Sequence, residues 1–333
     1  MRHLAILAIA LAVAALLYFA LRWRGGWMPR IGLIVLAVAI VLGGVWRLTP
    51  QEIVMPDHDN GEDVRPLYAK GRVLPQGPEQ VYHLGHSLVE RDMPAMLVQL
   101  AGHDYALQLG WGTALREHFQ GREAINGFAQ ENATPKYRDA HEALKSGEYG
   151  AFVMTEMVSV RDAILYKDSK TYVGKWAAEA VQGNPDIDIF LYETWHDLKA
   201  PDHDWLNRLP DDLDGLWTQL LWPAARAAGR PVWLIPAGQV LFALVTEAET
   251  GSGIAELRRR EDLFRDDIHM NDLGNYLIAL THYAVIYGKT PVGLPHELKL
   301  GNGEPAQAPS PELARRMQEV VWQVVTSQPL TGV

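Results

Sequence analysis

The most continuous hydrophobic pattern in the chain lies at its N-terminus. Residues 4–21 (LAILAIALAVAALLYFAL) and 31–46 (IGLIVLAVAIVLGGVW) contain no charged residue. Each run approaches the roughly 20 residues that a transmembrane helix needs. The pattern therefore predicts two antiparallel transmembrane helices, which form a membrane anchor over residues 1–48.

A cleaved signal peptide is the alternative interpretation of the first run. The membrane anchor is favoured because the run is long, lacks a small-residue cleavage site and is soon followed by a second run. The turn between the runs carries Arg22, Arg24 and Arg30, whereas the outer flanks carry Arg2 and Arg47. The positive-inside rule then places the turn in the cytoplasm and the main domain outside it, in the periplasm or the extracellular space.

A different pattern begins after the second run. Residues 49–79 are rich in Pro, Asp, Glu and Gly without a period, which is typical of a linker. Beyond residue 80, short apolar runs bounded by turn residues alternate with longer helical patterns. The predicted strands are Val81–Leu84, Tyr105–Leu109, Ala151–Met154, Ile187–Tyr192 and Val232–Ile235. The clearest predicted helices are Pro94–Ala101, Leu216–Ala228 and Pro311–Thr326.

Strands separated by helix-length segments predict βαβ units and a parallel sheet covered on both faces. Residues 80–333 are therefore expected to form an α/β domain, a three-layer α/β/α sandwich with a central parallel sheet. In such sheets, ligands bind beyond the carboxyl ends of the strands.

Composition narrows the possible functions. The 333 residues carry a net charge of −10, which argues against binding the phosphate backbone of nucleic acids. The chain has no cysteine, so disulfides, thiolate zinc sites and a cysteine nucleophile are excluded. Nothing in the sequence indicates a cofactor or fixes an oligomeric state.

Two short motifs carry candidate chemistry. Ser87 follows the first predicted strand in VYHLGHSL, where it is either a nucleophile or an ordinary turn residue. Near the far end, Asp266 lies three residues before His269, so its carboxylate can orient the imidazole as a base for Ser87. Asp267 is less well placed for this role. The alternative is that this segment only caps a helix beginning near Asn271.

Together the motifs resemble those of the SGNH hydrolase superfamily, the GDSL esterases and lipases. The family has Gly-Asp-Ser-Leu after its first strand and Asp-x-x-His before its last helix. The counterparts here are residues 85–88 (GHSL) and 266–269 (DDIH), and Gly274 with the apolar helix that follows it is also similar. The resemblance covers residues 80–293. It implies that Ser87 is the nucleophile, His269 the general base and Asp266 its orienting carboxylate.

The resemblance also implies an oxyanion hole, in which this chain departs from the family pattern. The family's glycine donor matches Gly112 or Gly110, with Gly112 preferred, although a glycine-rich turn is an equal alternative. The family's Gly-x-Asn-Asp block is missing after the third strand, where Thr155 is a candidate replacement. A lost oxyanion donor costs on the order of 100- to 1000-fold in rate. His86 replaces the motif aspartate, which is not a triad member.

Two further features have competing interpretations. Trp195, after the fourth predicted strand, either lines a substrate pocket or is buried at the strand end. His83 and His86 have the spacing of metal ligands, but the alternation of a strand places them on different faces. No metal site is therefore predicted.

The sequence thus predicts a membrane-tethered serine esterase with a Ser87–His269–Asp266 triad. Its expected substrate is an acyl ester, such as an O-acetyl group on a cell-envelope or exported glycan, or on a smaller molecule or a lipid. An O-acyltransferase with the same triad is one alternative. A non-catalytic carbohydrate-binding domain with a degenerate site is another.

Overall fold

The computed structural model describes residues 2–22, 25–48, 55–77, 79–199 and 204–333. The chain divides into two compact units, residues 1–54 and residues 55–333. Arg24, which was counted in the predicted cytoplasmic turn, and residues 49–54 and 78 of the predicted linker lie outside the described residues.

The first unit is a pair of helices, α1 (Arg2–Arg22) and α2 (Trp27–Leu48). Ala20 and Ala37 are buried at 4% and 3% exposure, whereas larger apolar side chains such as Phe19 remain exposed. Long apolar runs without an internal turn signal fold as helices here, as the sequence predicts.

The predicted membrane anchor is not supported. A helix that crosses the hydrocarbon core needs roughly 20 consecutive apolar residues. Among the helices of the described residues, none is long and apolar enough to do so. The prediction of two transmembrane helices is therefore wrong. The placement of the main domain outside the cytoplasm depended on those spans and is not supported either.

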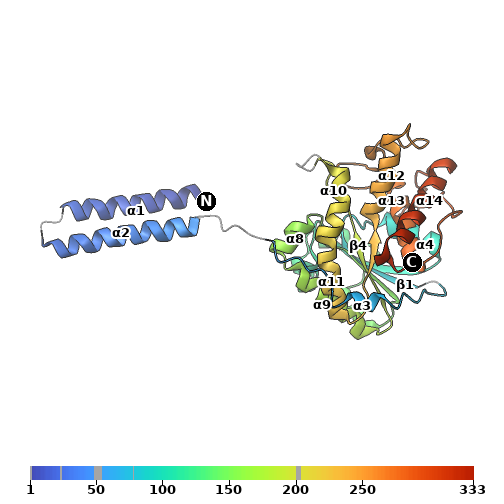
Figure 1. Ribbon diagram of the computed structural model, residues 1–333, viewed down its shortest axis with the longest axis horizontal. Helices are drawn as coiled ribbons and strands as arrows, with labels where there is room; N and C mark the ends of the chain where they lie inside the picture. The colour runs from blue at the N-terminus through green and yellow to red at the C-terminus, as the bar shows by residue number, and fades with distance from the viewer. Residues whose placement is uncertain (1, 23–24, 49–54, 78, 200–203) are drawn as a thin grey trace. The chain divides into compact units, whose positions relative to one another are not determined.

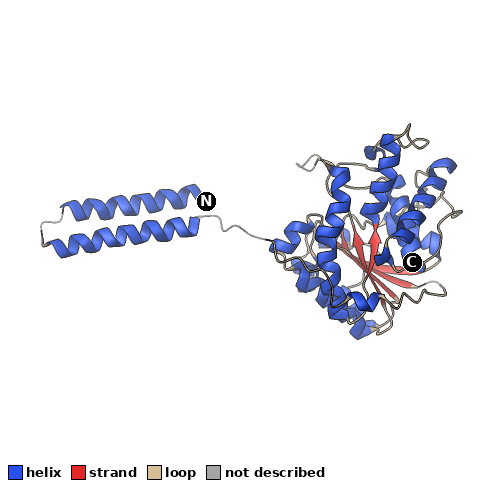
Figure 2. Ribbon diagram, in the orientation of Figure 1, coloured by secondary structure: helices blue, strands red, loops and turns tan. Residues whose placement is uncertain are grey.

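The second unit is built around a five-stranded parallel sheet with the order β2-β1-β3-β4-β5 (Figure 2). Each predicted apolar run overlaps one strand, so the predicted α/β fold with a parallel sheet is confirmed. The strands are β1 (Gln80–His86), β2 (Asp104–Gly110), β3 (Ala151–Met154), β4 (Asp188–Glu193) and β5 (Trp233–Pro236).

Helices cover both faces of the sheet, and side chains that alternate along each strand enter two separate cores. Val81 and Val153 belong to one core, and their neighbours Tyr82 and Phe152 belong to the other. The first core is closed by α4 (Asp92–Ala101), α12 (Ala237–Thr250), α13 (Asp272–Tyr287) and α14 (Pro311–Ser327). The second is closed mainly by α7 (Ala140–Ser146), α8 (Val160–Tyr166), α9 (Ser169–Gly183) and α11 (Thr218–Ala228) (Figure 1).

Shorter helices complete the domain around the edges of the sheet. They are α3 (Arg65–Tyr68), α5 (Leu115–Gln120), α6 (Phe128–Glu131) and α10 (Trp205–Asp212). A π-helical turn (Leu213–Trp217) joins α10 to α11, and 3-10 turns occupy Arg122–Ala124, Arg260–Leu263 and Pro329–Thr331.

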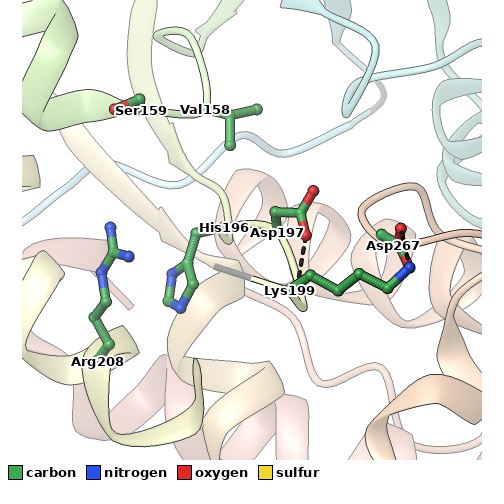
Figure 3. A pocket seen from close by; sticks show the side chains of 7 residues that line it. All are labelled: Val158, Ser159, His196, Asp197, Lys199, Arg208 and Asp267. Atoms are coloured by element: carbon green, nitrogen blue, oxygen red, sulfur yellow. Dashed lines mark hydrogen bonds and ion pairs between the residues drawn. The ribbon is translucent and has the colours of Figure 1, made fainter. Parts of the chain in front are cut away.

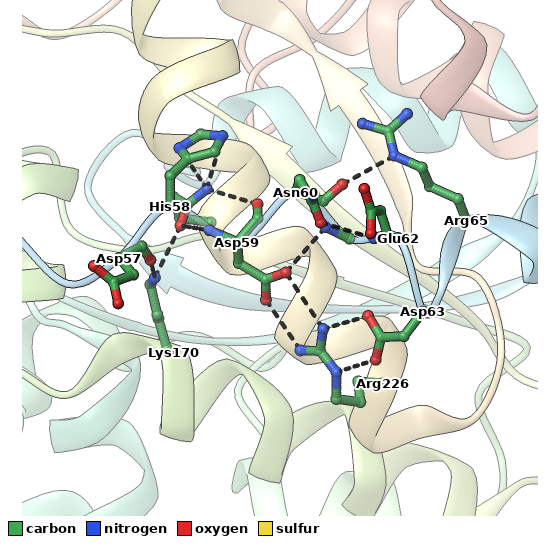
Figure 4. A network of polar contacts seen from close by, with 11 residues as sticks. Asp57, His58, Asp59, Asn60, Glu62, Asp63, Arg65, Lys170 and Arg226 are labelled. Carbon is green, nitrogen blue, oxygen red and sulfur yellow. Dashed lines mark hydrogen bonds and ion pairs between the residues drawn. The ribbon is translucent and has the colours of Figure 1, made fainter.

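The start of the second unit is fastened to α11 by a network of polar contacts (Figure 4). The Arg226 guanidinium lies 3.1 Å from the carboxylate of Asp59 and 2.6 Å from that of Asp63. Gln219 accepts the amide proton of Asp59 at 2.8 Å and donates to its carbonyl at 2.9 Å. Residues 57–63 therefore lie along this helix.

A fully buried histidine lies on the side of the sheet that faces the first core. His83 of β1 is fully buried, with its ring centroid 6.0 Å from that of His282 in α13 and 6.2 Å from that of Tyr105. Neither ring nitrogen of His83 has a hydrogen-bond partner among the described residues. Burial therefore lowers the pKa of His83 well below its usual value, and the ring is neutral in the folded protein.

This buried ring predicts acid sensitivity. Since the pKa of His83 is lower in the folded than in the unfolded chain, its contribution to stability is present above pH 6.5 and is lost as the pH falls. Thermal unfolding of the wild type at pH 7 and pH 5 should show this loss. His83→Leu should reduce it by about 2 kcal/mol. His296→Leu, in a surface loop, is the control, and an equal pH response in all three proteins would contradict the prediction.

Candidate active site

The end of β1 fixes the position of Ser87. His86, the last residue of the strand, pairs with Gly110 of β2, and Ser87 occupies the turn that follows. The Leu88 amide donates to His86 Nδ1 at 3.3 Å, so His86 Nε2 carries the proton and donates to the Glu156 carbonyl at 2.8 Å. Burial lowers the pKa of His86 to about 4, which keeps this ring neutral. His86 therefore holds the turn beneath Ser87.

The motif glycine has a packing role in the same strand. A Cβ atom at Gly85 would lie 2.5 Å from the Cγ2 atom of Thr155, the residue that follows the neighbouring strand β3. Such a distance is well inside van der Waals contact, so a larger residue would push β1 away from β3. Glycine here allows the two strand ends to approach closely.

The structure brings Ser87, His269 and Asp266 together. The Nε2 atom of His269 lies 3.0 Å from the Oγ atom of Ser87, although the two residues are 182 positions apart. The Nδ1 atom of His269 lies 2.8 Å from Oδ2 of Asp266. The three side chains thus form the hydrogen-bonded chain that a serine nucleophile, a base and an orienting carboxylate require.

Asp266 also organises its own loop. Its Oδ1 atom accepts the backbone amides of Ile268 at 2.9 Å and of His269 at 2.8 Å. Partial burial raises the pKa of Asp266, but these amides and the His269 ring outweigh it and lower the pKa to about 2. The carboxylate is therefore ionised at any pH at which an esterase operates.

The two adjacent aspartates have different partners. Asp267 turns away from the histidine and forms an ion pair with Lys199 at 2.6 Å. It lines a separate pocket of about 430 Å³, with His196 and Arg208 on the opposite wall (Figure 3). The cap of α13 is supplied by Asn271, which accepts the amides of Leu273 and Gly274. The helix-capping interpretation of Asp266 therefore does not describe its contacts.

Trp195 is buried behind the loop of residues 266–269 and does not form the wall of a substrate pocket. Its side chain is 2% exposed, and its indole N–H donates to the carbonyl of Ile268 at 2.7 Å. The amide of Leu198 donates to the Asp267 carbonyl at 2.8 Å. The chain that follows β4 thus holds the loop containing Asp266 and His269 from its inner side.

The three candidate oxyanion residues differ in whether packing or another hydrogen bond already occupies them. Gly112 lies two residues beyond the end of β2, with φ +51° and open space where a Cβ would be. At Gly110, a Cβ would lie 2.3 Å from Thr113 Oγ1, so this glycine serves packing. The Thr155 hydroxyl is fully buried and donates to the Tyr192 carbonyl at 2.8 Å. Of the three, Gly112 is therefore the residue that packing does not occupy, and the Thr155 hydroxyl is not available as a donor.

Ser87 opens into a groove of about 560 Å³. The groove is formed by segments that are far apart in the sequence, namely residues 87–92, 131–136, 265 and 300–302, together with Tyr105. Its position beyond the carboxyl end of β1 is where an α/β sheet binds ligands.

Glu90 is a residue of this groove that sequence reasoning missed. Its backbone is left-handed, with φ 55°, which is uncommon and strained for a residue with a side chain. Its carboxylate lies 2.9 Å from the Arg265 guanidinium and accepts a hydrogen bond from Asn275 at 3.2 Å. Burial raises the pKa of Glu90 to about 7. No local sequence signal marks this residue, because its partners come from the far end of the chain.

The comparisons with known proteins do not assign the chain to a family. No family model and no curated protein matches it. One similar solved structure is a DUF4886 family protein from Bacteroides uniformis, with a TM-score of 0.49 and 14% sequence identity. The match covers 74% of this chain and 94% of that one.

The bond between Trp195 and Ile268 predicts a local effect. Trp195→Phe removes a hydrogen bond with a net value of about 1 kcal/mol. Amide hydrogen exchange at residues 266–269 should then become about five- to tenfold faster.

The matched control is Trp176→Phe. The Trp176 indole makes a comparable bond to the Leu115 carbonyl at 3.0 Å within the other core. That variant should leave exchange at residues 266–269 unchanged. Equal exchange of this loop in the wild type and Trp195→Phe would show that Trp195 does not hold it.

Proposed function

We propose that the chain is a serine hydrolase of the SGNH type that cleaves acyl esters. The observation that carries the proposal is the hydrogen-bonded series from Asp266 through His269 to Ser87, at 2.8 Å and 3.0 Å. It unites two weak motifs from opposite ends of the domain at one edge of the sheet. A turn serine and a helix cap have no physical reason to meet in this order.

The proposed reaction begins with proton transfer. As the Ser87 Oγ atom attacks the ester carbonyl, its proton moves to Nε2 of His269, and the ionised Asp266 stabilises the imidazolium that forms. His269 then protonates the leaving alcohol, and the acyl group stays on Ser87. Water, deprotonated by His269, attacks the acyl-enzyme and releases the carboxylic acid with Ser87 restored.

The developing oxyanion would be bound by the backbone amides of Ser87 and Gly112. Thr155 does not supply the donor that the family's asparagine provides, since its hydroxyl is committed to the Tyr192 carbonyl. A missing donor of this kind lowers the rate on the order of 100- to 1000-fold. Slow turnover is therefore the expected behaviour.

Exposure of the site favours hydrolysis over acyl transfer to another hydroxyl. The His269 side chain is 26% exposed and that of Asp266 is 50% exposed. The acyl-enzyme would therefore lie within reach of bulk water, which competes with any alcohol acceptor.

The proposal predicts covalent labelling of Ser87. A fluorophosphonate should label the wild-type chain at Ser87 and should not label Ser87→Ala. Hydrolysis of 4-nitrophenyl acetate should be abolished in Ser87→Ala, and Asp266→Asn should lower kcat on the order of 10,000-fold.

Ser159→Ala is the matched control, because Ser159 lines the separate pocket on the other side of the Asp266 loop. It should keep both labelling and turnover. Hydrolysis that persists in Ser87→Ala would remove the assignment of the nucleophile.

A further inference from the structure

The surroundings of Ser87 also indicate a class of substrate. We infer that the groove binds a neutral sugar ring stacked on Trp111, and that the ester attacked by Ser87 is carried by that ring. The inference rests on the proposed esterase function.

Trp111 is an exposed aromatic side chain beside the candidate nucleophile. It follows Gly110, the residue that pairs with His86 across β2 and β1, and its side chain is 50% exposed. Its indole N–H donates to the Glu131 carboxylate at 2.5 Å, and its backbone amide donates to the Asn126 carbonyl at 2.8 Å. Glu131 lines the groove. The indole is therefore tied to a residue of the groove by one hydrogen bond, and a second bond fixes the backbone of Trp111.

One face of this indole is covered by backbone. A Cβ atom at Gly127 would lie 2.2, 2.5 and 2.7 Å from Cδ2, Cε2 and Cε3 of Trp111, which belong to the six-membered part of the ring system. Gly127 also has φ +66°, a conformation that side-chain-bearing residues rarely adopt. Only glycine lets the indole lie flat here, and the exposed half of the side chain is left as a flat platform.

The groove is lined by three basic and three acidic residues, and its basic side chains already have partners. Arg265 pairs with Glu90 at 2.9 Å, and Lys136 pairs with Asp104 at 2.5 Å. The Arg91 guanidinium donates to the carbonyls of Gln130 and Glu131 at 2.5 Å and 2.8 Å. An anionic ligand would have to displace these partners. A neutral ligand can use the remaining donors and acceptors without doing so.

The balance of polar and apolar groups excludes a long acyl chain as the main ligand. Most residues that line the groove are charged or polar, and its few apolar members are small or lie apart from one another, such as Ala133, Pro135 and Leu300. A pyranose ring fits both features, because its C–H face packs on an aromatic plane while its hydroxyls form hydrogen bonds. An acyl group on such a ring would be presented to Ser87 from the Trp111 side.

The test compares two acetate esters on the full chain. Acetate release is measured with methyl 6-O-acetyl-α-D-glucopyranoside and with ethyl acetate, and the ratio of their kcat/KM values is the readout. Trp111→Ala should lower this ratio about tenfold, mainly through a higher KM for the sugar ester. Trp111→Phe should lower it less.

Two further variants keep the result interpretable. Gly127→Ala retains the indole but displaces it, so it should lower the ratio as well. Tyr166→Ala removes another exposed aromatic side chain, 53% exposed at the end of α8, and should leave the ratio unchanged. An unchanged ratio in Trp111→Ala, with both esters still hydrolysed, would overturn the sugar platform and leave the esterase proposal standing.

Failure of the esterase proposal would be seen separately. If neither ester is cleaved and the fluorophosphonate does not label Ser87, the same acetylated sugar is titrated against 15N-labelled protein. A saturable shift of the Trp111 indole N–H signal, with no shift of the signal from the buried Trp176 indole, would still support the sugar site. No shift of that signal in the wild type would overturn it.

Discussion

The candidate site depends on how the loop of residues 265–269 is held against the carboxyl ends of the strands. Trp195 bonds the Ile268 carbonyl from inside, and Arg265 donates its backbone amide to the His269 carbonyl at 2.9 Å. Asp266 collects two amides of the same loop. These contacts orient the His269 ring toward β1, where His86 holds the turn of Ser87. The parallel sheet positions Ser87, and these few hydrogen bonds position His269 next to it.

The same end of the sheet carries a concentration of buried polar groups. Burial raises the pKa of Glu156, next to the end of β3, to about 7 and that of Glu193, at the end of β4, to about 8. Glu193 accepts a hydrogen bond from Gln239 at 2.7 Å, and Glu156 accepts the Met157 and Leu115 amides. Buried carboxyl groups reduce stability as they ionise. Carboxyl groups with perturbed pKa values are common at functional sites, and these lie at the same end of the sheet as Ser87 and the strained Glu90.

The strands could be predicted because each is buried on both faces and reads as an apolar run. The acid–base pair could be predicted because three-residue spacing brings Asp266 and His269 together within one loop. The membrane anchor was wrong, since apolar sequence alone does not establish a helix long and apolar enough to cross a bilayer. The sequence could not tell which of Trp195 and Trp111 is exposed. Both follow strand ends, and only packing decides that the first is buried and the second is half exposed. Glu90 and the groove depend on contacts between segments more than 100 positions apart, such as that with Arg265.

The double use of the Asp266 carboxylate has a consequence for the robustness of the site. The Asp266 carboxylate bonds both the imidazole ring and the backbone amide of His269. Residues 266–269 therefore form a self-contained unit. Displacement of the loop as a body would leave the tautomer and orientation of His269 intact. Such a displacement would change mainly the gap between His269 and Ser87. Reactivity would then fluctuate with the opening and closing of that gap, while the identity of the base remains fixed.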